Sequence, residues 1–176
     1  MPRGSLIAIS GICAGLAAVA VLTVSAERRN RSPWRPINAT SHWIYGRRAG
    51  SVSRLDLAHT GTGFATHMLA SFWWALPFAA MLGRNARPSP PRAIAAAAGT
   101  TVLAAVVDYG LVPKRLTPGW ELALPKSDLA MTYIAMGLGL AFGATLHSAA
   151  IATRPGTSRG LIGQVKQDIG SKTICE

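Results

Sequence analysis

Four long apolar stretches dominate this 176-residue chain and constrain it more than any other feature. Each reaches the ~20 residues with which an α-helix crosses a ~30 Å hydrocarbon layer. A backbone inside a membrane must satisfy its own hydrogen bonds, so single spans of this kind form helices. The sequence therefore predicts an all-α integral membrane four-helix bundle, with spans at about 5–26, 61–82, 93–112 and 129–150.

The composition favours a membrane protein over a nucleic-acid-binding protein. Hydrophobic residues make up 49% of the chain and charged residues 14%, and the apolar residues come in blocks instead of at every third or fourth position. The formal net charge is +11, but most arginines lie in short connectors between the blocks, where cations anchor to lipid headgroups and set topology. Because no helix-turn-helix, zinc finger or aromatic-basic platform is visible, we expect no nucleic-acid partner.

The first apolar stretch has two interpretations. A short basic start and Val24-Ser25-Ala26 before Glu27 resemble a signal peptide with its cleavage site. The apolar run is longer than the about 7–15 residues usual in such peptides, and Gly11-x-x-x-Gly15 gives the helix a flat face for packing. We expect a retained first span, with a cleaved leader as the alternative.

The connector between the first two spans, residues 27–60, is the longest in the chain. Two prolines stop a helix from continuing out of the first span. Trp34, Trp43 and Tyr45 alternate with arginines, a composition typical of the lipid headgroup region. We therefore expect an interfacial or re-entrant element between the first two spans and not a free linker.

The other connectors are short. Prolines within residues 84–92 exclude a helix there, so the second and third spans should form an antiparallel hairpin. The fourth span carries Gly139-x-x-x-Gly143, a motif for close helix packing. Residues 151–176 are polar and rich in glycine, which predicts a disordered tail after a transmembrane domain of residues 1–150.

A few ionisable residues inside or beside the spans form the candidate site. Helical periodicity places Asp56, His59 and His67 on one stripe of the second span. At about 1.5 Å per residue, His67 lies ~9 Å below the membrane boundary, and Asp108 on the third span lies ~6 Å below the same boundary. The topology therefore predicts that His59, His67 and Asp108 approach one another, whereas His147 belongs to the opposite end of the bundle.

Two interpretations of this cluster stay open. In the first, Asp108 pairs with His67 and holds two spans together, because a carboxylate within a span costs about 2.5–3.5 kcal/mol and normally faces a partner or water. In the second, His59, His67 and Asp108 bind a divalent metal ion or handle protons, with His42 as an additional ligand. The two-turn spacing of His59 and His67 is wider than that of the HExxH motif. The structural interpretation is therefore favoured, and no cofactor is expected.

The sequence offers no complete catalytic set. It contains no Gly-rich phosphate loop, Gly-x-Ser-x-Gly or CxxC motif, and Cys13 and Cys175 form no disulfide framework. We therefore expect a non-enzymatic multi-pass membrane protein that serves as an accessory or interaction unit of the bacterial inner membrane. The alternatives are a metal-dependent or proton-coupled membrane protein and a small transporter or channel subunit. Expected partners are the lipid bilayer and a second copy or another membrane protein.

Three segments combine aromatic, polar and proline residues in an unusual way. They are Pro36–Trp43, the run from Asp56 to Trp74 that contains His59 and His67, and Val107–Glu121. Together they resemble a family of small four-span bacterial inner-membrane proteins that has no assigned activity. The resemblance covers residues about 36–145 and implies that these segments belong to one four-span unit.

The distribution of cations leaves the orientation in the membrane open. Ten Lys and Arg lie on the side of the long connector, seven of them in Arg28–Arg54 and the others at Lys114, Arg115 and Lys126, and eight lie on the opposite side. Ten against eight decides nothing by the positive-inside rule. Both orientations of the N-terminus stay possible.

Overall fold

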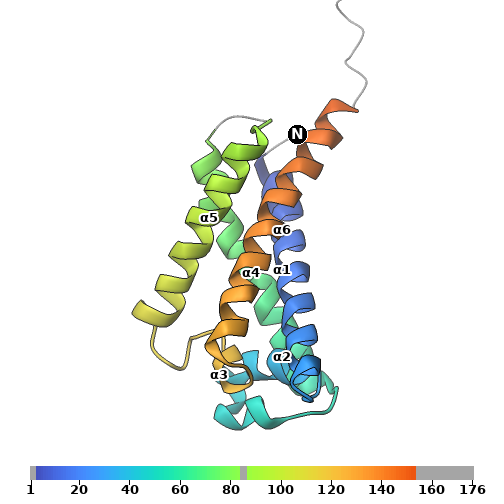
Figure 1. Ribbon diagram of the computed structural model, residues 1–176, viewed down its shortest axis with the longest axis vertical. Coiled ribbons are helices and arrows are strands. Elements are labelled where there is room, and N and C mark those ends of the chain that lie inside the picture. The colour runs from blue at the N-terminus through green and yellow to red at the C-terminus, as the bar shows by residue number, and fades with distance from the viewer. Residues whose placement is uncertain (1–2, 84–86, 154–176) are drawn as a thin grey trace, which may run out of the picture.

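The computed structural model describes residues 3–83 and 87–153 of the chain. Within these ranges the protein consists of helices and loops (Figure 1). The four long helices are α1 (Arg3–Arg28), α4 (Thr62–Leu82), α5 (Pro90–Val106) and α6 (Lys126–Ala152). All four are long and apolar enough to cross a membrane, α4 and α5 together with the short helical turns adjoining them. The predicted all-α fold with four helices long and apolar enough to span a membrane is confirmed.

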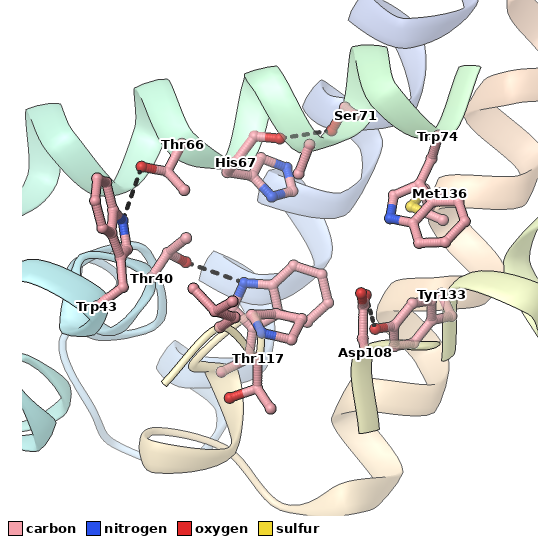
Figure 2. Close-up of a pocket in the computed structure, with 14 residues that line it drawn as sticks. Thr40, Trp43, Thr66, His67, Ser71, Trp74, Asp108, Thr117, Tyr133 and Met136 are labelled. Carbon is pink, nitrogen blue, oxygen red and sulfur yellow. Dashed lines mark hydrogen bonds between the residues drawn. The ribbon is translucent and has the colours of Figure 1, made fainter. Parts of the chain in front are cut away.

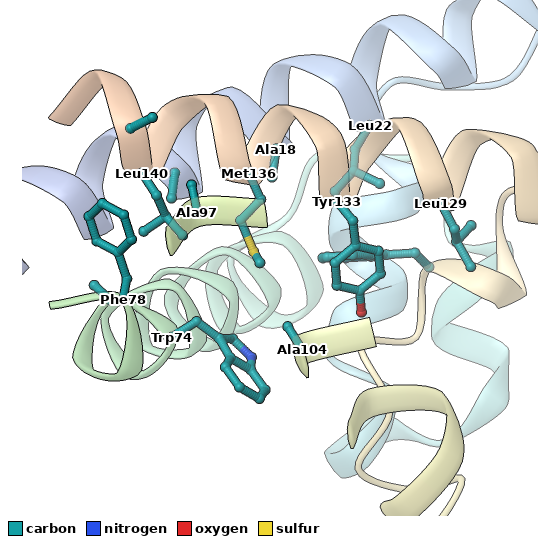
Figure 3. Close-up of a cluster of buried hydrophobic side chains, with 14 of the residues drawn as sticks. Ala18, Leu22, Trp74, Phe78, Ala97, Ala104, Leu129, Tyr133, Met136 and Leu140 are labelled. Carbon is teal, nitrogen blue, oxygen red and sulfur yellow. The ribbon is translucent and has the colours of Figure 1, made fainter. Parts of the chain in front are cut away.

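The bundle is built around α1 and α6, which lie side by side (Figure 1). α4 packs against α1, and α5 packs against α6. The core is mainly alanine with a few large side chains, among which Leu22, Phe78 and Leu140 are fully buried (Figure 3). Because alanine lets helix backbones approach closely, van der Waals packing between helices stabilises such a bundle in lipid.

The glycine motif of α6 lies at its contact with α1. A Cβ on Gly139 would lie 2.5 Å from the carbonyl oxygen of Cys13, and a Cβ on Gly143 would overlap the backbone of Ser10. No larger side chain fits at either position without moving a helix. The predicted close packing at this motif is confirmed, and α1 is identified as its partner.

The glycine motif of α1 faces α4. A Cβ on Gly11 would lie 2.6 Å from the ring of Phe72, and a Cβ on Gly15 would lie 2.6 Å from Sδ of Met68. Here glycine leaves room for large side chains of the neighbouring helix. α1 therefore contacts α6 on one face and α4 on another, as expected of an integral member of the bundle.

The connector between α1 and α4 folds across the end of the bundle opposite the N-terminus (Figure 1). It contains α2 (Arg35–Thr40), α3 (His42–Tyr45) and η1 (Arg47–Ser51), and a π-helical turn, η2 (Leu57–Gly61), leads into α4. Residues 36–42 are buried. The aromatic side chains expected at the interface are exposed: Trp34, Trp43 and Tyr45.

Asn38 holds this connector together. Its side chain is fully buried, and Nδ2 donates to the carbonyl oxygens of Val52 and Arg54, both at 2.9 Å. Oδ1 accepts a 2.6 Å hydrogen bond from Oγ1 of Thr60. The buried amide therefore has partners for both donors and for its acceptor. These bonds tie α2 to the segment before α4, so residues 27–60 form a folded cap and not a free linker.

Two helix boundaries change the predicted extent of a connector and of the tail. α5 begins at Pro90, within the segment 84–92 that was expected to be non-helical. A proline at the first helical position loses no intrahelical hydrogen bond, and its fixed φ suits a helix start. α6 continues to Ala152, which moves the start of the predicted tail. Residues 154–176 lie outside the described part of the chain.

Candidate functional site

A cavity of about 280 Å³ lies between α4, α6 and the loop after the π-helical turn η3 (Val107–Leu111) (Figure 2). Three indoles line it, those of Trp43, Trp74 and Trp120, together with several polar groups. Leu116 in its wall is 62% exposed, so the cavity opens to the surface of the bundle. An apolar hollow with a few polar groups is the usual form of a small-molecule site.

His67 forms part of this wall from α4. Its side chain is buried, and Nε2 lies 3.0 Å from the carbonyl oxygen of Gly15 on α1. A carbonyl oxygen only accepts, so Nε2 is the donor, and Nδ1 of a neutral imidazole then keeps its lone pair. Since no residue of the described ranges hydrogen-bonds to Nδ1, this nitrogen is an acceptor available to a ligand.

Asp108 lines the cavity from η3. Its Oδ2 accepts a 2.7 Å hydrogen bond from the hydroxyl of Tyr133 on α6. Its other carboxyl oxygen, Oδ1, has no hydrogen-bond partner within the described part of the chain. π-Helical turns often occur at functional sites, where they redirect one side chain out of the regular helical register. Asp108 thus both joins two helices and presents an oxygen to the cavity.

Trp74 supplies the cavity with an unused donor. Its side chain is 9% exposed, and its indole N–H has no hydrogen-bond partner among the residues that the structure describes (Figure 2). The other two indoles are paired: Trp43 donates to Thr66 and Trp120 donates to Thr40, each at 3.2 Å. Indole N–H groups in apolar surroundings usually find a partner, so the unpaired N–H of Trp74 is a donor available to a ligand in this wall.

Aromatic contacts hold the floor of the cavity. The ring centroid of Trp120 lies 5.7 Å from that of His67 and 5.7 Å from that of Tyr133. Tyr133 in turn contacts the ring of Tyr109 edge-on at 6.2 Å. These spacings are those of favourable aromatic pairs, so the ring positions are fixed by one another.

Gly119 brings Trp120 into this position. Its φ is +84°, a left-handed conformation that favours glycine. A Cβ there would also lie 2.5 Å from Nδ1 of His42 and would overlap the carbonyl oxygen of Ala39. The loop can therefore lie directly on α2 and α3, with the indole of Trp120 directed into the bundle at the start of η4 (Trp120–Leu122).

The structure places two of the three predicted site residues at the cavity. His67 and Asp108 both line it, but each has its own partner, Gly15 and Tyr133. The expected structural pairing of Asp108 with His67 is therefore replaced by a link between Asp108 and α6. His147 lies beside Ser5, 3.4 Å from its hydroxyl, at the other end of the bundle.

His59 and His42 have other roles. The backbone N–H of His59 donates to Oδ1 of Asp56 at 2.6 Å, and its Nδ1 lies 3.1 Å from the same oxygen, so Asp56 caps the start of η2. His42 is buried in α3 between two backbone carbonyl oxygens. Within residues 3–83 and 87–153, no three His, Cys, Asp or Glu side chains are grouped as metal ligands. The metal site of His59, His67 and Asp108, with His42, stays a prediction.

The sequence interpretation did not identify Tyr133 or the role of Trp120. Tyr133 is a lone tyrosine in an apolar span, and its hydroxyl needs a partner at that depth. The requirement of this hydroxyl for a hydrogen-bond partner could have predicted its pairing with Asp108. Trp120 lies in a loop whose course depends on Gly119 and on contacts with α2, which no local pattern indicates.

Comparisons with known proteins found no matching protein family, no similar curated protein and no similar solved structure. The resemblance to small four-span bacterial proteins therefore stays a prediction. Functional inference for this chain rests on its fold and on the groups that line its cavity.

Proposed function

We propose that this protein is a non-enzymatic multi-pass membrane protein that binds an uncharged amphiphile in the cavity between α4 and α6. Such binding suits an accessory or interaction unit of the bacterial inner membrane. The observation that carries the proposal is the unfilled N–H of Trp74 in an apolar wall that also holds acceptors on His67 and Asp108.

A hydroxyl group matches this set of polar groups. It accepts one hydrogen bond and donates another, so it pairs with the indole N–H and with one of the two acceptors. Polar groups left unpaired in an apolar site cost free energy, and a ligand that pairs with them is favoured over one that does not. The indoles and Met136 supply apolar contacts for the rest of the ligand.

The size and position of the cavity limit the ligand further. At about 280 Å³ it holds a ring-sized group and not a whole lipid. His67 lies six residues beyond Gly61, the last residue of η2, which corresponds to a depth of ~9 Å. An amphiphile in the bilayer would insert its hydroxyl-bearing ring through the opening at Leu116 and keep its chain among the lipids.

Three matched probes test the proposal. We would titrate para-decylphenol, its methyl ether and decylbenzene into the full-length protein in detergent, follow heat release, and subtract titrations into protein-free micelles. The phenol donates and accepts, the ether only accepts, and decylbenzene does neither, so we expect affinity to fall in that order. Equal affinities for the three probes would refute recognition of a hydroxyl group.

A pair of tryptophan variants assigns the site. Trp74→Phe removes the unfilled donor, and we expect it to weaken phenol binding about tenfold, the equivalent of one hydrogen bond. Trp73→Phe is the matched control, because Trp73 is 66% exposed on the outer face of the same helix and does not line the cavity. Unchanged phenol affinity in Trp74→Phe, or an equal loss in Trp73→Phe, would contradict the proposal.

One observation supports the alternative of a metal-dependent or proton-coupled protein: His67 and Asp108 share the cavity. Metal analysis of the purified protein tests this alternative, together with His67→Ala and Asp108→Asn. A stoichiometric metal ion that is lost in both variants would replace the amphiphile proposal with a metal site. Variants that change only thermal stability would favour the structural role of these residues.

A further inference from the structure

A second hollow, of about 460 Å³, shares Trp43 with the cavity. We call it the cationic groove and define it by Trp43 and Ile44 of α3, Arg47 of η1, and Lys114 and Arg115 of the loop after η3. Segments far apart in the sequence therefore bring three cations and two exposed apolar side chains to one hollow.

The cations of this groove lack carboxylate partners. Across the described ranges, none of Arg47, Lys114 and Arg115 lies within 4.0 Å of a carboxylate oxygen. Glu121 lines a neighbouring hollow together with Arg47 and Lys114, but its carboxylate accepts hydrogen bonds from Thr117 and Tyr109. Three groove cations against one nearby carboxylate leave an excess of positive charge, and none of the three forms an ion pair within the described residues.

Hydrogen bonds fix the loop that carries two of these cations. Nε of Arg115 donates to the carbonyl oxygen of Trp43 at 3.2 Å, which leaves the terminal nitrogens of the guanidinium for a ligand. The backbone N–H of Leu116 donates to Pro113 at 2.8 Å and closes a turn. A cation on an ordered loop loses less conformational entropy on binding than one on a flexible loop.

His42 holds the same loop from behind. Its Nε2 lies 3.2 Å from the carbonyl oxygen of Lys114, and its Nδ1 lies 3.0 Å from that of Ala39. Carbonyl oxygens only accept, so a neutral ring can donate to one of them and an imidazolium to both. His42 therefore fixes the position of Lys114 in the wall of the groove, which His42 also lines.

We infer that the cationic groove binds the phosphate of an anionic lipid headgroup. Guanidinium and ammonium groups are the side chains that bind phosphate, and clusters of Lys and Arg at a membrane surface attract anionic lipids. Trp43 is 39% and Ile44 49% exposed beside the cations, which suits the boundary between headgroups and acyl chains. The inference does not depend on the amphiphile proposed for the cavity.

Short-chain lipids test the inference with the full-length protein in a non-ionic detergent. We would titrate dihexanoyl phosphatidylglycerol, dihexanoyl phosphatidylcholine and inorganic phosphate and measure the dissociation constant of each. Phosphatidylglycerol should bind most tightly, since phosphatidylcholine carries its own cation and free phosphate lacks the apolar part. Phosphatidylcholine that binds as tightly as phosphatidylglycerol would overturn the inference. Inorganic phosphate that binds as tightly as phosphatidylglycerol would show that the groove binds free phosphate and not the phosphate of a lipid.

Two double variants of equal charge locate the site. Arg47→Gln with Lys114→Gln removes two groove cations whose side chains make no hydrogen bond within the described structure, so the fold should be kept. We expect a loss of about fivefold per cation, hence about twenty-fivefold in affinity for phosphatidylglycerol. Arg28→Gln with Arg48→Gln is the control outside the groove and should weaken binding by less than about threefold. Equal losses in the two variants would show general surface attraction and overturn the site.

Discussion

The hydroxyl of Tyr133 donates a 2.7 Å hydrogen bond to Oδ2 of Asp108, which joins α6 to η3, the helical turn that follows α5. The ring of Tyr133 also contacts Trp120 and lines the cavity. One side chain therefore serves both a helix contact and a cavity wall. Bundle stability and cavity shape are coupled at this position.

Tyr133→Phe should lower the free energy of unfolding by about 1 kcal/mol, because it removes one interhelical hydrogen bond and keeps the ring. Unfolding of the detergent-solubilised protein by a denaturing detergent measures the change. Tyr109→Phe is the control, since the Tyr109 hydroxyl makes a longer, 3.3 Å bond to the exposed Glu121. Equal losses in the two variants would contradict a special role for the Tyr133–Asp108 pair.

Gly139→Ala should destabilise the bundle by about 1–3 kcal/mol, because its Cβ would overlap Ala14 and the carbonyl oxygen of Cys13 and force α1 and α6 apart. Thermal unfolding measures the effect. Gly99→Ala in α5 is the matched control: its Cβ would lie 3.5 Å from Sδ of Met81, an ordinary contact. Alanine favours helix at that position, so the control should unfold at the same or a higher temperature, and a lower temperature there would count against the packing argument.

Ser10→Ala should raise the free energy of unfolding by up to about 1 kcal/mol. The hydroxyl of Ser10 is buried in α1 and has no hydrogen-bond partner among the described residues, and a buried unpaired hydroxyl costs free energy. Thermal unfolding measures the gain. Ser71→Ala is the comparison, because the Ser71 hydroxyl donates to the carbonyl oxygen of His67 at 2.9 Å. Destabilisation by Ser10→Ala would show that the hydroxyl has a partner after all.

Stability should depend on Asp56 in the acidic range. The hydrogen bond from the backbone N–H of His59 holds the pKa of the Asp56 carboxyl below its ordinary value of 3.8, against the opposing effect of burial. The ionised carboxylate therefore contributes its full stabilisation above that value, and the contribution is lost as the pH falls through the lower, folded-state pKa.

The unfolding temperature of wild type and Asp56→Asn, measured as a function of pH, tests this dependence. Asparagine does not titrate, so the advantage of wild type should be constant above the ordinary pKa and shrink below it. A difference between the two proteins that stays constant into strong acid would contradict the capping role of the Asp56 carboxylate.

The spans and the positions of the close helix contacts were largely predictable from sequence. Helix length and hydropathy are local properties, and membrane thickness sets the length that a span needs. Glycines four residues apart mark a close contact because they leave one helix face flat, and both motifs lie at such contacts. Counting residues from the boundary also placed His67 and Asp108 near the same depth, where both now line one cavity.

The partners of those groups were not predictable in the same way. Which side chain Asp108 meets depends on the rotation of α5 relative to α6, which depth alone does not specify. Likewise, the hydrogen bonds of Asn38 and the path of the loop at Trp120 join segments that are distant in sequence. Such contacts are set by the packing of the whole chain and not by a local pattern.

The hydrogen bonds of Asn38 have a consequence for the order of assembly during synthesis. They join residues at most 22 positions apart, all of which precede α4. These hydrogen bonds of the cap can therefore form once the chain up to Thr60 has left the ribosome, since chains fold from the N-terminus as they are made. The cavity between α4 and α6 needs Tyr133 and Met136 of α6, so it is complete only after the last helix is inserted.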